Sequence, residues 1–214
     1  HRKLDVVKIG LLHIEPNEQG ARLNRVKDVF GIEELMFLST CNRVEFTLVS
    51  NGPISIEKLI QSLYPELPIS EAVFLAKNVE EYNAEEAVNH AFSVASSIES
   101  MIVGEREIIT QVRNAFDCSN KNKLTGDFLR LLIRQVIQTA KKVYTQTSIA
   151  TKPVSVVSLA YHKLKELNIP LGSRILIIGS GATNATMCKF LKKHGFSNFV
   201  VFNRTVSNAT SLAQ

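Results

Sequence analysis

The feature that most constrains the fold is an apolar run that ends at a pair of glycines. Residues 174–178 read Arg-Ile-Leu-Ile-Ile, typical of a buried parallel strand, and Gly179-Ser180-Gly181 follow at once. A helical pattern covers residues 182–194, and a second apolar run covers residues 199–202. This order predicts a βαβ unit whose helix can turn its first backbone amides toward a phosphate group.

The glycine turn matches the first two glycines of the dinucleotide fingerprint and has Asn184 in place of the third. Arg204 follows the second strand, where a guanidinium suits a 2′-phosphate, so the sequence favours NADPH over NADH. The alternative is a βαβ linker that binds no nucleotide. The residues expected to bind the cofactor are Gly179, Ser180, Gly181, Ala182, Thr183, Asn184, Asn203, Arg204 and Thr205. A Rossmann-type domain has more strands than these, so we expect residues 151–214 to be a truncated one.

The first 150 residues predict a separate α+β domain. Strands are expected at 5–12, 35–38, 44–49 and 73–76, with helices at 17–31 and 56–64. This βαββαβ order is ferredoxin-like. Helical spacing follows at 84–97, 105–120 and 125–147, which predicts a helical part. The chain as a whole is therefore expected to be of the α/β class, with domains at 1–150 and 151–214.

The last of these helices has a basic face. Arg130, Arg134 and Lys141 fall within about 40° of one another, opposite an apolar side. The formal net charge of +5 is compatible with a nucleic-acid partner. Two interpretations stay open, which are contact with a nucleic-acid backbone and an ordinary solvated face.

Cysteine usage and hydropathy indicate the compartment. Cys41, Cys118 and Cys188 are odd in number and far apart, which argues against a disulfide framework and against a paired-cysteine zinc site. No apolar run approaches the roughly 20 residues that span a bilayer, and the first residues lack the apolar core of a signal peptide. We expect a cytoplasmic protein without a metal or a membrane association.

The stretch around Cys41 is the first with a chemical signature. It reads Leu-Ser-Thr-Cys-Asn-Arg-Val-Glu over residues 38–45, so a thiol lies in a polar loop beside a guanidinium. A free thiol of pKa about 8.5 is only about 3% thiolate at neutral pH, and a nearby cation raises that fraction. Arg43 could act in this way, or could hold a substrate carboxylate at two points. The alternative is an ordinary buried thiol.

Further motifs follow in a fixed order. Thr-Cys-Asn-Arg at 40–43 precedes His-x-Phe-x-Val-Ala-Ser at 90–96, Ser-Met-Ile-Val-Gly-Glu at 100–105 and Gln-Val at 111–112. This set, with the glycine turn after it, resembles the glutamyl-tRNA reductase family over about residues 35 to 210. The resemblance implies NADPH-dependent reduction of glutamyl-tRNA to glutamate-1-semialdehyde through a cysteine thioester. That reaction is the first step of C5 tetrapyrrole (porphyrin, haem) biosynthesis.

The resemblance also implies roles for particular residues. Cys41 matches the nucleophile, and His90 matches a histidine important for activity, either as a general base or by ordering the site. The positions that match the family's recognition of glutamate are Thr40, Asn42, Arg43, Ser100, Glu105, Arg106, Glu107 and Gln111. Implied partners are glutamyl-tRNA, a glutamate-1-semialdehyde aminomutase that receives the product, and a second copy in a full-length homodimer.

The sequence departs from the family pattern at several places. Glu107 stands where the family usually has Gln, Ile98-Glu99 stand where it has Leu-Asp, and the segment after His13 differs. Two other functions therefore remain, which are another NADPH-dependent reductase similar to shikimate dehydrogenases and a non-catalytic tRNA-binding homologue. Because the catalytic motifs precede residue 153, we expect acyl chemistry from these 214 residues without efficient reduction.

Overall fold

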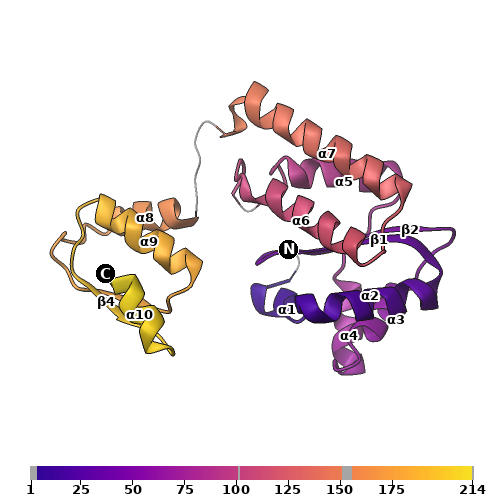
Figure 1. Cartoon of the computed structure of the whole chain (residues 1–214), viewed down its shortest axis with the longest axis horizontal. Helices are drawn as coiled ribbons and strands as arrows, with labels where there is room; N and C mark the ends of the chain where they lie inside the picture. Colours follow the sequence, from indigo (N-terminus) through magenta and orange to yellow (C-terminus); the bar gives the residue numbers. More distant parts are fainter. Residues whose placement is uncertain (1–3, 101, 151–155, 214) are drawn as a thin grey trace. The chain divides into compact units, whose positions relative to one another are not determined.

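The computed structural model describes residues 4–100, 102–150 and 156–213. The chain divides into two compact units, His1–Lys152 and Pro153–Gln214, whose elements are labelled in Figure 1. Each unit is described by itself.

A two-stranded antiparallel sheet lies at the centre of the first unit. Strands β1 (Ile32–Ser39) and β2 (Val44–Ser50) pair with Phe37 opposite Phe46. Helices α2 (Pro16–Phe30), α3 (Ile56–Leu63) and α4 (Ile69–Lys77) lie on one side of the sheet, and α5 (Glu85–Ala95), α6 (Glu107–Lys121) and α7 (Asp127–Gln146) on the other (Figure 1). The two strands and all these helices except α4 confirm the expected elements.

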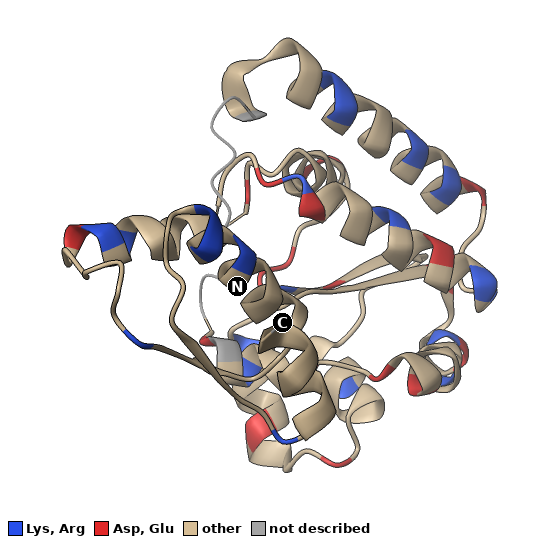
Figure 2. Cartoon of the chain, turned by 60° about the vertical axis from the view of Figure 1, so that its left-hand side comes forward, with Lys and Arg blue, Asp and Glu red and all other residues tan. Residues whose placement is uncertain are grey.

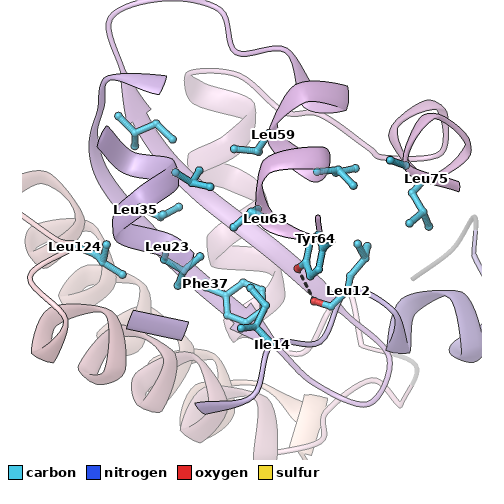
Figure 3. Close-up of a cluster of buried hydrophobic side chains, with 14 residues drawn as sticks. Leu12, Ile14, Leu23, Leu35, Phe37, Leu59, Leu63, Tyr64, Leu75 and Leu124 are labelled. Carbon is cyan, nitrogen blue, oxygen red and sulfur yellow. Dashed lines mark hydrogen bonds between the residues drawn. The ribbon is translucent and has the colours of Figure 1, made fainter. Parts of the chain in front are cut away.

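The alternation of side chains along β1 serves both helical layers. Leu35 and Phe37 join one buried cluster with α2, α3 and α4, whereas Met36 and Leu38 join a second with α5, α6 and α7. In the first cluster the hydroxyl of the buried Tyr64 donates to the carbonyl oxygen of Leu12 at 2.6 Å (Figure 3). Burial raises the pKa of this phenol, so the hydroxyl stays protonated. Its hydrogen bond to Leu12 means that the polar group is not left unpaired inside the core.

Two expected strands are helices, so the ferredoxin-like order is wrong. Residues 5–12 contain the short helix α1 (Val6–Gly10), which Asp5 caps by accepting from the amide of Lys8 at 2.8 Å. Residues 73–76 belong to α4, which begins directly after Pro68. In both segments the buried residues are three apart, Ile9 with Leu12 and Ala72 with Leu75, which is helical spacing. The mixed helix and strand class itself is confirmed.

Helix α7 shows the expected division of its two sides. Leu129, Ile133, Val136 and Ala140 are buried, whereas Arg130, Arg134 and Lys141 are exposed. The Lys and Arg residues recur as blue bands along this helix (Figure 2). A residue of β1 caps its N-terminus. The Glu34 carboxylate accepts hydrogen bonds from the backbone amides of Gly126, Phe128 and Leu129 at 2.8–3.0 Å.

The second unit contains the expected βαβ arrangement. Strands β3 (Ile175–Ile178) and β4 (Phe199–Phe202) are parallel and are joined by α9 (Ala182–Lys193). Helix α8 (Val156–Glu166) precedes them, and α10 (Val206–Ala213) follows. The expectation that β3 is wholly buried is wrong: Ile177 is 6% exposed, but its neighbour Ile178 is 69% exposed. Within the described residues, only one face of this two-stranded sheet is covered.

Candidate active site

Cys41 occupies the turn between β1 and β2, where its side chain is exposed. The turn is closed by its own hydrogen bonds. The amide of Thr40 donates to the carbonyl oxygen of Arg43 at 2.7 Å, and the amide of Asn42 donates to the Thr40 hydroxyl oxygen at 3.3 Å. The expectation of a polar loop between strands is confirmed, and the alternative of an ordinary buried thiol is wrong for Cys41.

Arg43 points the other way, into the protein, and is 4% exposed. Its Nη1 donates to the Glu45 carboxylate, and its Nη2 donates to the carbonyl oxygen of Glu99 at 2.6 Å. The second bond joins the cysteine turn to the loop after α5, which carries Ser100. Because both terminal nitrogens have protein acceptors, a two-point grip on a substrate carboxylate would require these bonds to be exchanged.

Glu45 links Arg43 to His90. The Nε2 atom of His90 lies 2.9 Å from Glu45 Oε1, the same oxygen that accepts from Arg43. The Tyr82 ring stacks on the His90 ring with centroids 4.4 Å apart and planes at 18°. Burial by itself would raise the pKa of Glu45, but the hydrogen bond from His90 and the charge of Arg43 outweigh it, so the pKa lies below its usual range.

A cavity of about 480 Å³ adjoins these side chains. Arg43, Glu45, Tyr82 and His90 contribute to its polar lining, and apolar residues from both clusters contribute much of the rest. Among the described residues that line it, Cys41 does not occur, since the thiol lies on the exposed turn two residues before Arg43. The structure thus places an exposed thiol two residues before Arg43, from which hydrogen bonds lead inward through Glu45 to His90.

The remaining predicted recognition residues lie on the loop after α5 and on α6. Ser100, Glu105 and Gln111 are half-buried, whereas Arg106 and Glu107, at the start of α6, are exposed. Burial raises the pKa of Glu105, and the neighbouring Glu107 raises it further. The structure joins Thr40, Asn42 and Arg43 to one another, and Arg43 to His90 through Glu45. For the five residues on the loop after α5 and on α6, the structure shows no described contact with Cys41.

Glu45 and Tyr82 contact His90 in the structure, although no sequence motif assigns them a role. A signal existed for Glu45, because side chains two residues apart in extended backbone share a face, and Arg43 directly precedes β2 while Glu45 lies on it. Tyr82 lies on an irregular segment before α5, where no periodicity predicts what its ring contacts.

The predicted nucleotide-binding turn is assembled in the second unit. Gly179 has a φ of +95°, a conformation that glycine adopts readily, and Asn184 Nδ2 donates to the carbonyl oxygens of Ile178 and Gly179 at 2.8 and 3.0 Å. The amide of Ser180 donates to Asn203 Oδ1 at 3.2 Å, which ties the turn to the end of β4. Asn184, the departure from the fingerprint, thus holds the turn in shape.

The geometry of this turn fits a phosphate-bearing cofactor. Gly181 is the N-cap of α9 without a side-chain cap, and a Cβ placed on it would meet no atom within 4 Å. Ala182 and Thr183 begin the helix on its exposed side, and Arg204 is exposed after β4. Backbone amides in such a setting bind anionic oxygens. In contrast, no group of three or more His, Cys, Asp or Glu residues suited to a metal ion occurs in the described part of the chain.

The fold and these sites define a class of protein: an α/β unit that presents a cysteine on a strand-to-strand turn, followed in the chain by a dehydrogenase-type βαβ unit. Comparison with known proteins makes the class specific. Residues 1–147 match the family model described as Glutamyl-tRNAGlu reductase, N-terminal domain, and residues 158–214 match Shikimate / quinate 5-dehydrogenase. The chain belongs to the glutamyl-tRNA reductase family. Its second unit implies a dehydrogenase-type nucleotide cofactor.

Individual relatives agree with this assignment. The chain is 35% identical to glutamyl-tRNA reductase of Rhodopirellula baltica over 199 residues, which are 89% of this chain and 46% of that protein. It is 36% identical to glutamyl-tRNA reductase 2 of Koribacter versatilis over 186 residues, covering 86% and 42%. The solved glutamyl-tRNA reductase from Methanopyrus kandleri is similar with a TM-score of 0.61 and 26% identity, over 100% of this chain and 50% of that one. The chain spans about half the length of the curated relatives it matches.

These comparisons confirm the resemblance found in the sequence. A shikimate-dehydrogenase-like reductase accounts for the second unit alone, because the first unit matches a different family. Separately, none of the described helices is long and apolar enough to cross a membrane.

Proposed function

We propose that this chain carries the thioester-forming site and the start of the cofactor domain of a glutamyl-tRNA reductase. The whole enzyme would reduce glutamyl-tRNA to glutamate-1-semialdehyde. The observation that carries this proposal is the exposed Cys41 on a turn that Arg43, Glu45 and His90 anchor, within a chain of this family.

The first step is an acyl transfer to Cys41. Its thiolate sulfur attacks the carbonyl carbon of the glutamyl ester, a carbon–sulfur bond forms, and the bond to the tRNA ribose oxygen breaks. The thiol proton passes to a base, for which His90 is the candidate, and the same proton is then given to the departing ribose oxygen, so that the tRNA leaves with a free hydroxyl. A thioester is a better hydride acceptor than an ester, which is a physical reason for cysteine in place of serine.

NADPH is the cofactor we propose for the second unit, and when bound it supplies the hydride that reduces the thioester to the aldehyde. Gly179 and Gly181 leave room for its phosphates, and Ser180, Ala182 and Thr183 contribute backbone amides at the start of α9. Asn184, Asn203 and Thr205 keep the turn in place, and Arg204 suits a 2′-phosphate.

Substrate recognition is proposed for the first unit. Thr40, Asn42, Arg43, Ser100, Glu105, Arg106, Glu107 and Gln111 would hold the glutamyl group. The exposed Arg130, Arg134 and Lys141 on α7 would contact tRNA phosphates. A cytoplasmic location, a full-length homodimer and an aminomutase that receives the reactive aldehyde also belong to this proposal.

Deacylation of glutamyl-tRNA without a cofactor tests the proposal. The chain should release glutamate, since water slowly hydrolyses the thioester when no hydride is available. The Cys41→Ala variant should fall to the uncatalysed rate. Cys118→Ala is the matched control, because Cys118 is half-buried beside Gln19 and should be dispensable. Equal deacylation by Cys41→Ala and the unaltered chain would refute the thioester.

A further inference from the structure

One carboxylate oxygen of Glu45 interacts with two neighbouring side chains, Arg43 and His90. Its Oε1 accepts from Arg43 Nη1 and lies 2.9 Å from His90 Nε2. The side chains of Arg43, His90 and Glu45 are 5%, 19% and 24% exposed, so the three groups meet largely away from water. None of the roles proposed above for the motif residues requires a carboxylate at this position.

The ionised state of Glu45 determines which ring nitrogen carries the hydrogen. An ionised carboxylate has only acceptor oxygens, so the nitrogen that faces it must be the donor. His90 therefore carries its hydrogen on Nε2, and Nδ1 is the nitrogen that can accept a proton when the ring is neutral. Stacking against Tyr82 fixes the plane of the ring, so the direction of Nδ1 is also fixed.

We propose that Glu45 is a positioning residue that holds His90 in one tautomer and one orientation and couples it to the Arg43 that anchors the cysteine turn. This inference rests on the proposed function for the part His90 plays in forming the thioester. The hydrogen bonds of the Glu45 carboxylate go to Arg43 and His90, and none of those described goes to Cys41. Glu45 acts through His90, as carboxylates that bond catalytic and metal-bound histidines do.

The plain alternative is an ion pair that stabilises the fold and has no effect on the reaction. The two accounts differ for a folded Glu45→Gln variant. Glutamine keeps the size and one acceptor oxygen but removes the charge, so a purely structural pair predicts lower stability with an unchanged reaction rate. A positioning role predicts a slower reaction step at the same substrate affinity.

The first readout is nuclear magnetic resonance of the His90 ring and needs no activity. The Nε2 proton bonded to a carboxylate should give a downfield signal protected from exchange with water, and His90→Gln identifies it. In Glu45→Gln this signal should move upfield and exchange about tenfold faster, because a charged acceptor is replaced by a neutral one. Glu57→Gln removes an exposed charge from α3 and should leave the signal unchanged. An unaltered signal in Glu45→Gln would overturn the proposal.

The second readout is the single-turnover rate of acyl transfer from glutamyl-tRNA to Cys41. In Glu45→Gln the maximal rate should fall about 100-fold, the lower end of what a positioned acid or base contributes. The half-saturating tRNA concentration should stay within about twofold, since no substrate contact is removed. Weaker saturation at an unchanged maximal rate would make Glu45 a binding residue and would contradict the proposal.

The two readouts separate this inference from the proposed function. If the unaltered chain forms no thioester, the proposed function fails, and the resonance of His90 still decides whether Glu45 positions the ring. Should Glu45→Gln not fold, Glu45→Asp retains the charge but shortens the side chain by one methylene, which moves the carboxylate away from His90 Nε2. Because the hydrogen bond is then lost, the resonance should again move upfield and the maximal rate should again fall.

Discussion

Arg43 shows how a single buried side chain can organise the candidate site. Its two terminal nitrogens join β2 to the loop after α5, because one donates to Glu45 and the other to the carbonyl oxygen of Glu99. The sequence motif identified Arg43 as important. It could not show that the guanidinium points inward, because the direction of a side chain at a strand end depends on which segments pack against it.

Replacement of Arg43 by Lys tests this double attachment. A lysine ammonium keeps the charge but cannot reach both acceptors with the planar fork of a guanidinium, so one bond is lost. The free energy of unfolding of the first unit should fall by about 2 kcal/mol, the loss of a charged hydrogen bond from a buried partner. Urea denaturation measures it, with the exposed Arg113→Lys on α6 as the control. A change no larger than that of Arg113→Lys would contradict the double attachment.

At the scale of elements, helix α7 depends on a distant residue. Glu34 on β1 accepts from three amides at the start of α7, which neutralises donors that the helix cannot satisfy itself. The capping residue and the helix it caps are 92 or more positions apart in the chain, so local sequence signals around residue 126 gave no indication of it.

Glu34→Ala should therefore destabilise the first unit by about 2 kcal/mol, combining a lost cap with a lost charge at the helix N-terminus. Glu33→Ala is the control, because Glu33 is exposed on the same strand and bonds the side chain of Asn51. Chemical denaturation of the three proteins gives the comparison. If the Glu34 and Glu33 variants unfold at the same denaturant concentration, the cap contributes nothing.

The glycine turn after β3 offers a matched pair of substitutions. Gly179 has a φ of +95°, so Gly179→Ala should strain the turn and lower the stability of the second unit by about 1–3 kcal/mol. Gly181 has a φ of −68° and open space where a Cβ would lie, so Gly181→Ala should fold normally. Its methyl group would instead obstruct an approaching phosphate. Thermal unfolding and NADPH binding measured on both variants should separate these effects; equal stability losses would contradict the assignment.

The elements that the sequence predicts correctly have longer or better bounded patterns than those it predicts wrongly. The βαβ unit and the long helices α5, α6 and α7 were correct because their apolar periodicity extends over several turns or is bounded by glycine. Residues 5–12 and 73–76 are short apolar stretches whose spacing fits either a strand or a helix. The capping side chain of Asp5 and Pro68 before α4 favour the helix, and in each segment the buried residues are three positions apart, as in a helix.

At the scale of the whole molecule, the chain divides into two compact units that match two different family models. The sequence singles out the cysteine turn, Arg43 and His90 as candidates because they lie in short motifs. The contacts of His90 with Glu45 and Tyr82 form only when segments distant in the chain meet. The sequence also predicts that the glycine turn and residues 203–205 lie together, because a βαβ unit brings its two strand ends side by side, and the hydrogen bond from Ser180 to Asn203 agrees with this.

Acid should weaken the first unit through Glu45. The pKa of Glu45 in the folded chain lies below its ordinary value of 4.5, so the stability it contributes is present above that pH and is lost as the pH falls through the lower folded value. The difference in free energy of unfolding between the unaltered chain and Glu45→Gln should thus be constant near neutral pH and shrink below about pH 4.5. Denaturation across a pH series checks this. A difference that persists unchanged into acid would mean that Glu45 is not held ionised.

The most direct test of the proposed chemistry is to identify the atom that receives the glutamyl group. Radiolabelled glutamyl-tRNA is mixed with the chain in the absence of NADPH, quenched in acid to preserve a thioester, and digested for peptide mapping. We predict label on the peptide that contains Cys41, sensitive to hydroxylamine and absent from Cys41→Ser. Deacylation of the tRNA with no label on protein, or with label on the peptides of Cys118 or Cys188, would contradict the proposed thioester.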